Sequence, residues 1–468
     1  MDYGMNKTAF GWKTHNLRYR YPALLKGLFR LMTGNERPLQ RKILNDYLNG
    51  FLSKRQIYLE SVSRFGTPQY FFDEPCLVNQ IELFRQAFSS CFENYRVFYA
   101  MKSNSFEGIS RQMVSRNVGI DVSSGLELAK ALCLDCRDII FSGPGKTSEE
   151  LLLAFKNRDR VTLLLDSAGE LQSLREVVSR EKQPYPSLKL GIRVRNDCQG
   201  RWNKFGVPLK DLIPLYLKAG RLEGAEPCGI QFHTSWNLDA APQIRMIEKI
   251  GDHIRRHMPP DMLDSLEFID IGGGFWPEQG EWLNPQNTLR GEFLRLLDPD
   301  YHFGSGRYHR MAQPLRYFAK SIAEALKQQG PPLSLLETWM EPGRWISTPA
   351  MHILVRVVDK KDAVTLITDA GIHLLGWERP LTEFIPIINL TKPGLKEKGM
   401  NIFGSLCTPQ DVWGTSIFGE GAEPGDVLLI PDQGAYTYSL RQSFIKPSAD
   451  VIGFDGKGFD LLEQGERV

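Results

Sequence analysis

The 468-residue sequence lacks long apolar runs, a surplus of charge of either sign and the features of a secretory leader. No stretch approaches the ~20 apolar residues that a membrane-spanning helix needs. The N-terminal residues have neither a short apolar core nor a small-residue cleavage site. The net charge of +2 gives no reason to expect nucleic acid as a partner. These absences favour a small-molecule substrate and argue against a membrane protein.

Cysteine is also sparse, with seven residues in the chain. An odd and small number argues against a disulfide framework. Cys133 and Cys136 form a CxxC pair, but no second pair stands at the spacing of a zinc site, so helix packing is the simpler interpretation. We therefore expect no bound metal and a cytoplasmic protein with free thiols.

The chain is long enough for at least two domains. From about residue 95, short β-type runs alternate with amphipathic helical stretches, which predicts a (β/α)8 TIM barrel, although an open doubly wound sheet gives the same alternation. The eight runs span 95–102, 118–124, 138–145, 161–167, 188–196, 227–236, 266–275 and 333–344.

Both flanks of the barrel differ from it in pattern. After Arg344, strand-like runs joined by turns predict an antiparallel β domain. The predicted segments are an N-terminal helical extension over 1–64, an entry segment over 65–94 that contributes to the β domain and the barrel edge, the barrel over 95–345, and a β-sandwich or β-barrel domain over 346–468.

Two further segments carry predictions of their own. The basic and aromatic extension contains candidate helices at 22–32 and 39–50, which read as a packing extension or, less simply, as a membrane-surface helix. The segment 276–314 is a long connection, rich in aromatic residues and proline, between the last two predicted barrel strands. Connections of that length are usually functional or carry small elements.

Polar clusters follow the predicted strands at the edge where barrel enzymes place their active sites. Lys102 ends the apolar run FYAMK. Because desolvation lowers the pKa of a lysine, its amine could form an imine with an aldehyde; the alternative is a lysine that merely ends a strand.

Glycines form the second cluster. Gly272, Gly273 and Gly274 would let backbone N–H groups approach a phosphate, or would simply allow a tight turn. The GPGK at 143–146 is a weaker phosphate signal, because Ile140 stands where the P-loop pattern needs its first glycine.

Two more strand ends carry Glu341, Arg344 and His233. A buried glutamate can hold a proton on a ring nitrogen, and an arginine can bind an anion; the alternatives are an internal ion pair and a structural histidine. Together, a lysine amine, a glycine loop, a carboxylate and an arginine are the parts of a site for pyridoxal phosphate.

The whole series of motifs resembles the fold-type III pyridoxal-phosphate decarboxylases, which include diaminopimelate, ornithine and arginine decarboxylases, and is most similar to the diaminopimelate branch. The motifs, in the family's order from about Phe65, are YAMKSN, DVSSGLELAKAL, FSGPGK, NKFGV, QFHTSW, DIGGGF, EPGR, TDAG, ERP, GSLCTPQD and QGAY. The resemblance implies an alanine racemase-like barrel, a second β domain, pyridoxal 5'-phosphate as cofactor, an amino-acid-like substrate and a homodimer with shared active sites.

The resemblance also implies roles for individual residues. The implied catalytic residues are Lys102, which would bind the cofactor aldehyde, His233, which would stack on its ring, Glu341, which would pair with the ring nitrogen, and Cys407, a proton donor from the neighbouring subunit. The further cofactor-binding residues are Asp121, Ser235, Gly272, Gly273, Gly274, Gly343, Arg344 and Tyr436. The substrate-binding residues are Arg344, Arg379, Glu383, Thr408, Asp411 and Tyr436.

Three positions depart from the family's pattern. Thr408 stands where an acidic residue grips the substrate's distal amine, Glu383 stands where the diaminopimelate enzymes have a tyrosine, and Trp236 places an indole near the phosphate side. We therefore expect decarboxylation of a different substrate, an amino acid or an amino-acid conjugate. A racemase or epimerase on the same scaffold and a non-catalytic relative are the alternatives.

Overall fold

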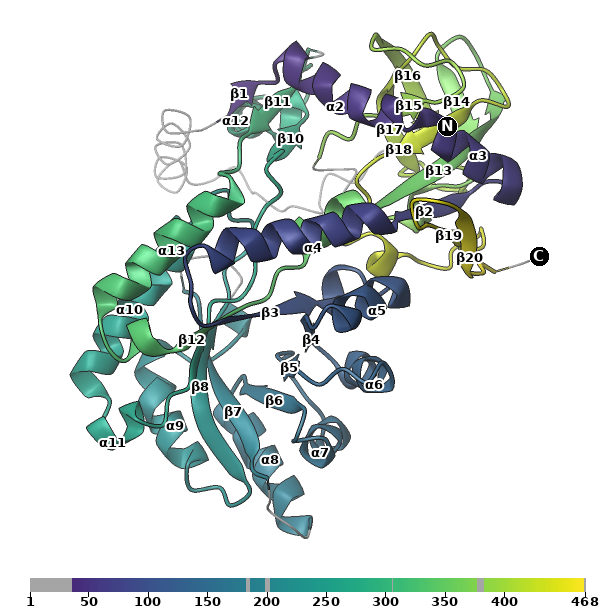
Figure 1. Ribbon diagram of the computed structural model, residues 1–468. Coiled ribbons are helices and arrows are strands. Elements are labelled where there is room, and N and C mark those ends of the chain that lie inside the picture. The colour runs from purple at the N-terminus through teal and green to yellow at the C-terminus, as the bar shows by residue number, and fades with distance from the viewer. Residues whose placement is uncertain (1–35, 182–185, 198–202, 305, 377–382, 467–468) are drawn as a thin grey trace, which may run out of the picture.

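The computed structural model describes residues 36–181, 186–197, 203–304, 306–376 and 383–466. Figure 1 shows a barrel wrapped by helices and, beside its upper end, a second domain rich in strands. The long helix α4 (Glu74–Ser89) runs between the two. The N-terminal helices lie against the second domain rather than the barrel.

The barrel is closed and parallel, with its strands in chain order from β3 through β9 and with β12 between β9 and β3. An open doubly wound sheet is therefore excluded, and each predicted run coincides with one strand, although β8 begins two residues before its run. The strands are β3 (Tyr95–Ala100), β4 (Gly119–Val122), β5 (Ile139–Phe141), β6 (Val161–Leu165), β7 (Leu188–Val194), β8 (Ala225–Phe232), β9 (Phe268–Asp270) and β12 (Glu337–Met340).

Large side chains fill the inside of the barrel. Phe98, Phe268 and Trp339 belong to a small apolar cluster that is separate from the main core, and the last two rings stack 3.6 Å apart. Glycine makes room for them: a Cβ at Gly229 would lie 2.1 Å from the ring of Phe268. The barrel is a packed core, as such barrels generally are, so its polar residues gather at the open carboxyl end.

Helices cover the outside of the barrel. In α4, apolar residues at helical spacing (Leu77, Ile81, Phe84 and Phe88) form a buried stripe. Asp73 caps this helix by accepting a hydrogen bond from the N–H of Cys76 at 3.0 Å. The other helices around the barrel are α5 (Glu107–Ser115), α6 (Gly125–Cys133), α7 (Ser148–Lys156), α8 (Ala168–Arg180), α9 (Leu212–Ala219), α10 (Ala241–His257), α11 (Pro260–Leu263) and α13 (Leu315–Gln329).

The second domain is a nine-stranded sheet in the order β14-β16-β17-β15-β18-β13-β2-β19-β20. Most neighbours are antiparallel, but β14–β16, β15–β17 and β2–β19 pair in parallel. The strands are β2 (Gln69–Asp73), β13 (Met351–Lys360), β14 (Thr365–Thr368), β15 (Ile388–Asn389), β16 (Glu397–Phe403), β17 (Val412–Phe418), β18 (Val427–Ile430), β19 (Asp450–Phe454) and β20 (Phe459–Glu463). Since β2 precedes the barrel in sequence, the chain enters the second domain before it forms the barrel.

The N-terminal segment holds α2 (Arg41–Ser53), close to the predicted helix at 39–50, and also α3 (Arg55–Phe65), which the sequence patterns did not predict. The predicted helix at 22–32 lies outside the described residues. Lys54, between the two helices, forms an ion pair with the buried Asp73 at 2.8 Å. The described part of the extension, from residue 36 on, therefore packs on the second domain.

The long connection before β12 forms small elements of its own: β10 (Glu281–Leu283), α12 (Leu289–Leu297) and β11 (Tyr308–Arg310). Its two strands and β1 (Arg37–Pro38) make a three-stranded antiparallel sheet. The N-terminal segment and this connection are thereby joined.

Cys133 is the exposed last residue of α6, and Cys136, beyond the helix, is buried. In the part of the chain that the structure describes, no helix is long and apolar enough to span a membrane, and no cluster of histidine, cysteine and acidic residues could hold a metal ion.

Candidate active site

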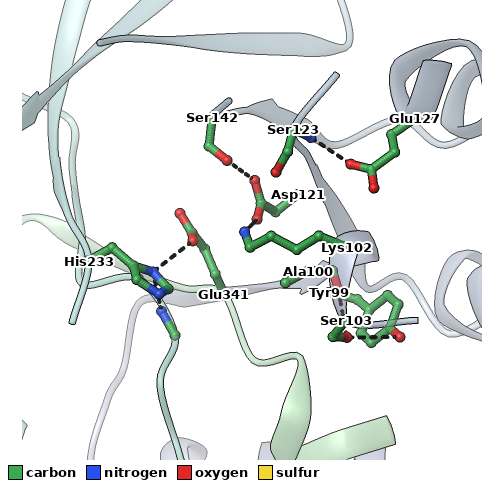
Figure 2. A network of polar contacts seen from close by, with 12 residues as sticks. Tyr99, Ala100, Lys102, Ser103, Asp121, Ser123, Glu127, Ser142, His233 and Glu341 are labelled. Carbon is green, nitrogen blue, oxygen red and sulfur yellow. Dashed lines mark hydrogen bonds and ion pairs between the residues drawn. The ribbon is translucent and has the colours of Figure 1, made fainter. Parts of the chain in front are cut away.

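The polar residues predicted at the strand ends converge at the carboxyl end of the barrel (Figure 2). Lys102 lies in a short 3-10 turn directly after β3, and Asp121 lies in β4. His233 follows β8, and Glu341 follows β12. Four side chains that are far apart in the sequence thus share one polar pocket, because parallel strands bring their carboxyl ends to one rim.

Lys102 is held by a buried carboxylate. Its Nζ lies 2.6 Å from Oδ2 of Asp121, whose side chain is fully buried, while a third of the Lys102 side chain remains exposed. The hydroxyl of Ser142 donates to the other oxygen of Asp121. The amine is therefore fixed in position yet open on one side.

The expected lowering of the pKa of Lys102 is wrong for this arrangement. Burial does lower its pKa, but the attraction of Asp121 and Glu341 outweighs burial and raises the net pKa above its ordinary value. Burial also raises the pKa of Asp121, to about 6, against the opposing attraction of Lys102. The sequence could not predict this, because only the fold places the two acids beside the amine.

Glu341 is almost wholly buried and lies across the pocket from Asp121. Gln231 donates a hydrogen bond to its Oε1 at 3.0 Å, and Nδ1 of His233 lies 3.4 Å from its Oε2. Burial tends to raise the pKa of Glu341, but the hydrogen bond with His233 and the charge of Lys102 lower it, and the net pKa falls below the ordinary value. Glu341 is therefore an anion in a dry site.

His233 lies between this glutamate and the glycine loop. The N–H of Gly273 donates to its Nδ1 at 3.2 Å, and its side chain is 11% exposed. Burial lowers the pKa of His233 despite the attraction of Glu341, so the ring is neutral at physiological pH. A neutral, fixed ring at this place is suited to packing against a planar ligand.

The glycine loop is built for close approach of the backbone. A Cβ at Gly273 would lie 2.2 Å from the carbonyl oxygen of Glu341, and one at Gly274 would lie 2.2 Å from that of Thr234. Gly272 and Gly274 also have positive φ angles of 66° and 82°. The N–H groups of Gly272 and Gly273 have partners in the chain, so these two residues shape the loop rather than donate to a phosphate.

Arg344 begins the short helix α14 (Arg344–Ser347) beside this loop. Its guanidinium lies between two rings, 4.4 Å from the centre of the Trp276 ring and 4.9 Å from that of Tyr436. Tyr436 comes from the second domain, and its N–H donates to the carbonyl of Ser103 at 2.7 Å. The second domain thus closes one side of the pocket next to Lys102.

The remaining predicted cofactor residues are close to this group. Gly343 lies against the lysine turn, since a Cβ there would be 2.8 Å from Ser103. Ser235 is half-buried and follows Thr234, while Trp236 is 59% exposed and so points largely to solvent. Lys146 of GPGK is buried against Glu170 at 2.9 Å, which makes that motif structural rather than a phosphate loop.

Several of the residues predicted to act on the substrate lie on the second domain. Cys407 is exposed, and Thr408 next to it hydrogen-bonds Gln410, in the loop between β16 and β17. Asp411 is buried and accepts hydrogen bonds from the N–H groups of Ile372 and Leu406 at 2.8 and 2.7 Å, so its carboxylate shapes the loop. Arg379 lies outside the described residues.

Glu383 does not belong to the loop of Cys407 but lies near the 276–314 connection. It lines a cleft together with Arg344 and Trp276, and it also borders a cavity of about 1000 Å³ between the 276–314 connection and the second domain. Glu383, which departs from the family's pattern, therefore lies in the same cleft as Arg344.

Three functional residues were not singled out from the sequence: Gln231, Asp270 and Trp276. Gln231 and Asp270 stand within the quoted motifs QFH and DIGGGF, and each occupies a strand end at the polar rim. Their position at carboxyl ends of barrel strands was the available signal. Trp276 follows the glycine loop directly, but nothing local indicates that it contacts Arg344.

Known proteins are similar to this chain in sequence and in fold. The chain is 28% identical over 444 residues to diaminopimelate decarboxylase of Methanothermobacter thermautotrophicus, covering 87% of this chain and 91% of that protein. The crystal structure of diaminopimelate decarboxylase from M. jannaschii with L-lysine matches with a TM-score of 0.72 at 23% identity, over 88% of this chain and 92% of that one. The Helicobacter pylori enzyme with L-lysine matches with a TM-score of 0.70 at 23% identity, over 88% and 97%. At such identities the structures establish the fold.

The family itself is established by a match over more than half of the chain. Residues 78–348 match the model of the pyridoxal-dependent decarboxylase, pyridoxal binding domain. This range contains Lys102, the glycine loop, Glu341 and Arg344, whose arrangement fits the aldehyde, the ring nitrogen and the phosphate of the cofactor. The chain belongs to the pyridoxal-dependent decarboxylases and is a carboxy-lyase with pyridoxal phosphate as its cofactor.

Proposed function

We propose that this enzyme removes the α-carboxyl group from an amino acid or an amino-acid conjugate that is not recognised through a free distal ammonium group. The observation that carries the proposal is the anionic Glu341, buried across the pocket from Lys102. A buried anion there holds a proton on the cofactor ring nitrogen, and a protonated ring is the strong electron acceptor that loss of carbon dioxide requires.

In this proposal Lys102 is the residue whose amine would hold the cofactor through its aldehyde. Asp121 accepts a hydrogen bond from the Lys102 amine and keeps it near the strand end when it is free. His233 would pack against the cofactor ring, and Gly274 and Arg344 would hold its phosphate region. Bound pyridoxal phosphate supplies the conjugated ring that accepts the electrons of the broken carbon–carbon bond.

Cys407 is proposed to return a proton to the substrate carbon from a neighbouring subunit. Its exposure on the β16–β17 loop supports this role, since a proton donor for another chain's pocket must lie at the surface of its own. Tyr436, by contrast, lies beside Lys102 within the same chain. We therefore propose a homodimer in which each pocket takes a cysteine from its partner.

The substrate proposal rests on the two departures next to these residues. Thr408 has no charge and hydrogen-bonds Gln410, so it offers no ion pair to a distal amine. Glu383 adds a carboxylate to the cleft of Arg344 and borders a cavity of about 1000 Å³, which is at the upper end of ligand-sized pockets. We propose a substrate larger than the diaminopimelate of the named relatives, with Arg379 as a partner for a distal carboxylate.

The location proposed is the cytoplasm, because the six cysteines in the described part of the chain are free thiols. The N-terminal extension is proposed to be a packing extension, supported by the ion pair of Lys54 with Asp73.

Carbon dioxide release tests the proposal against racemisation. The purified enzyme, loaded with pyridoxal phosphate, is incubated in deuterated buffer with amino acids and with their distally acylated or carboxylated conjugates. We expect carbon dioxide and a product amine with one deuterium at the reacting carbon, from conjugates in preference to free diamino acids. Deuterium exchange without carbon loss would favour the racemase, and neither reaction with any substrate would favour a non-catalytic relative.

A further inference from the structure

Asp270, the last residue of β9, is fully buried at the carboxyl end of the barrel. Its Oδ1 accepts a hydrogen bond from the N–H of Gly272 at 2.8 Å. Its Oδ2 is also buried, and no N–H or O–H donor of the described residues lies beside it. Instead, the Asp270 carboxyl contacts that of Glu341. Two acid groups that meet in a dry site require an explanation.

The charges around this pair do not balance if every acid is ionised. Three buried carboxyl groups, those of Asp121, Asp270 and Glu341, meet at this barrel end. The ammonium of Lys102 lies against Asp121 at 2.6 Å. His233 is neutral. Two adjacent carboxylates without a shared cation cannot both ionise in such a site, so one of the pair holds a proton.

In addition to burial, a further cation, Arg193 on β7, lowers the pKa of His233 through its charge. Its guanidinium donates to the carbonyl of Ser142 at 3.1 Å and lies over the ring of Phe205 at 4.7 Å. In the described part of the chain, the Arg193 guanidinium therefore contacts Ser142, which follows β5, and Phe205, and not the Asp270–Glu341 pair.

The surroundings decide which of the two acids keeps the proton. Glu341 receives an N–H from Gln231 at 3.0 Å and is stabilised as an anion by the positive charge of Lys102. Asp270 receives one backbone N–H and faces the negative charge of Glu341. Burial and that charge raise the pKa of Asp270 well above its ordinary value. The stabilising contacts therefore favour the anion at Glu341.

We propose that Asp270 is protonated at neutral pH and donates its proton as a hydrogen bond to Glu341, as a positioning residue that keeps Glu341 ionised and aimed at the cofactor ring. The same carboxyl group accepts the N–H of Gly272 through its other oxygen. Asp270 thus connects the ring-nitrogen side of the pocket to the glycine loop. The inference rests on the proposed role of Glu341, but its first test does not depend on turnover.

Infrared spectroscopy of the cofactor-free protein tests the protonation state directly. A carboxylic acid has a carbonyl stretch that is separate from carboxylate and amide bands. We expect such a band at neutral pH in the wild type, its loss in Asp270→Asn, and its retention in the control Asp121→Asn. In Glu341→Gln, where the neighbouring charge is gone, the band should disappear at a lower pH than in the wild type. A wild type without the band, or a band unaffected by Asp270→Asn, would overturn the proposal.

Two substitutions of Asp270 distinguish a role as hydrogen-bond donor from a role as negative charge. Asparagine can donate an N–H to Glu341 and accept from Gly272, whereas alanine can do neither. Because hydrogen bonds to charged groups are worth more than neutral ones, Asp270→Ala should bind pyridoxal phosphate about tenfold or more weakly than Asp270→Asn. Equal losses in both variants would mean that Asp270 acts as an anion. If the alanine variant does not fold, the infrared comparison of the wild type with Asp270→Asn still decides the question, even for an enzyme that releases no carbon dioxide.

Discussion

The carboxyl end of the barrel and the β16–β17 loop of the second domain both carry residues proposed for catalysis, in opposite surroundings. Lys102 and Glu341 lie in a polar pocket in which residues of the same chain hold each of them: Asp121 pairs with Lys102, and Gln231 donates a hydrogen bond to Glu341. Cys407 is exposed, and the buried Asp411 fixes its loop by accepting hydrogen bonds from the N–H groups of Ile372 and Leu406. The residues at the barrel end are buried or partly buried and face one another, whereas the loop presents its reactive group outward.

This difference separates two tasks. Holding a cofactor requires fixed charges in a dry site, which a barrel rim supplies from several strands. Delivering a proton to another subunit requires an exposed group on a rigid loop. We therefore expect changes at the barrel end to affect cofactor binding, and changes in the loop to affect turnover alone.

The largest effect is expected for Lys102→Ala. Removing the amine removes the covalent bond to the cofactor, so the variant should release no measurable carbon dioxide and should carry no pyridoxal phosphate that borohydride can fix to the chain. Mass spectrometry of the reduced protein measures this. Covalently fixed cofactor in the variant would contradict the assignment of Lys102.

Cys407→Ala is expected to lower turnover by about 10²–10⁴-fold, the range for loss of a positioned proton donor, with unchanged cofactor affinity. Cofactor titration and carbon dioxide release are measured on the same sample. Cys91→Ala is the matched control, because Cys91 is also exposed but lies outside the pocket. A loss of cofactor affinity together with the loss of turnover would show that Cys407 acts in cofactor binding, like the residues at the barrel end.

Mixing the two inactive variants sharpens the comparison. A dimer of one Lys102→Ala and one Cys407→Ala chain has one intact pocket if the cysteine comes from the partner. Random reassociation of equal amounts should then restore roughly a quarter of the wild-type activity. No recovery, with exchange of subunits verified by mass, would place the cysteine and the lysine in the same chain.

Asp411→Ala tests the rigidity of the loop and should have a smaller effect. It leaves the N–H groups of Ile372 and Leu406 without their acceptor, at a cost of about 1–3 kcal/mol each. We expect turnover to fall about tenfold with cofactor affinity retained, and Asp411→Asn to be less impaired because one acceptor oxygen remains. If Asp411 contacts substrate instead, both variants should raise KM with little change in stability.

The smallest effect on activity at neutral pH is expected for His352→Gln, which tests how firmly the second domain is built. His352 is buried against Phe51, Tyr58 and Phe71, and its Nδ1 accepts the N–H of Asp432 at 3.1 Å. Burial lowers the pKa of His352 to about 4. Because the unfolded chain binds this proton first, stability is lost as the pH falls from about 6.5 to about 4.

This loss amounts to about 3 kcal/mol at most, and it should be absent from His352→Gln. Denaturant unfolding of the cofactor-free protein at several pH values measures the difference. His302→Gln is the control, since His302 is exposed and should leave the pH dependence unchanged. An identical pH dependence in the wild type and His352→Gln would show that His352 is not neutral in the fold.

Local sequence patterns predicted the barrel strands well, because each is a short apolar run bounded by polar turn residues. They did not predict α3 or strands such as β17 and β19, whose pattern depends on which neighbours cover them. They did not predict the sign of the pKa shift of Lys102 either, since Asp121 and Glu341 approach it only through the closed barrel.

The order of motifs along the chain determined the family and the chemistry, because residues such as Lys102 and Glu341 carry their reactivity in their side chains. The tertiary structure alone decided which charges meet. It put Asp270 against Glu341, stacked Arg344 between two rings and turned Cys407 outward. The physical reason is that charge interactions depend on distance and burial, and both are set by strand ends that are far apart in sequence and adjacent at one rim.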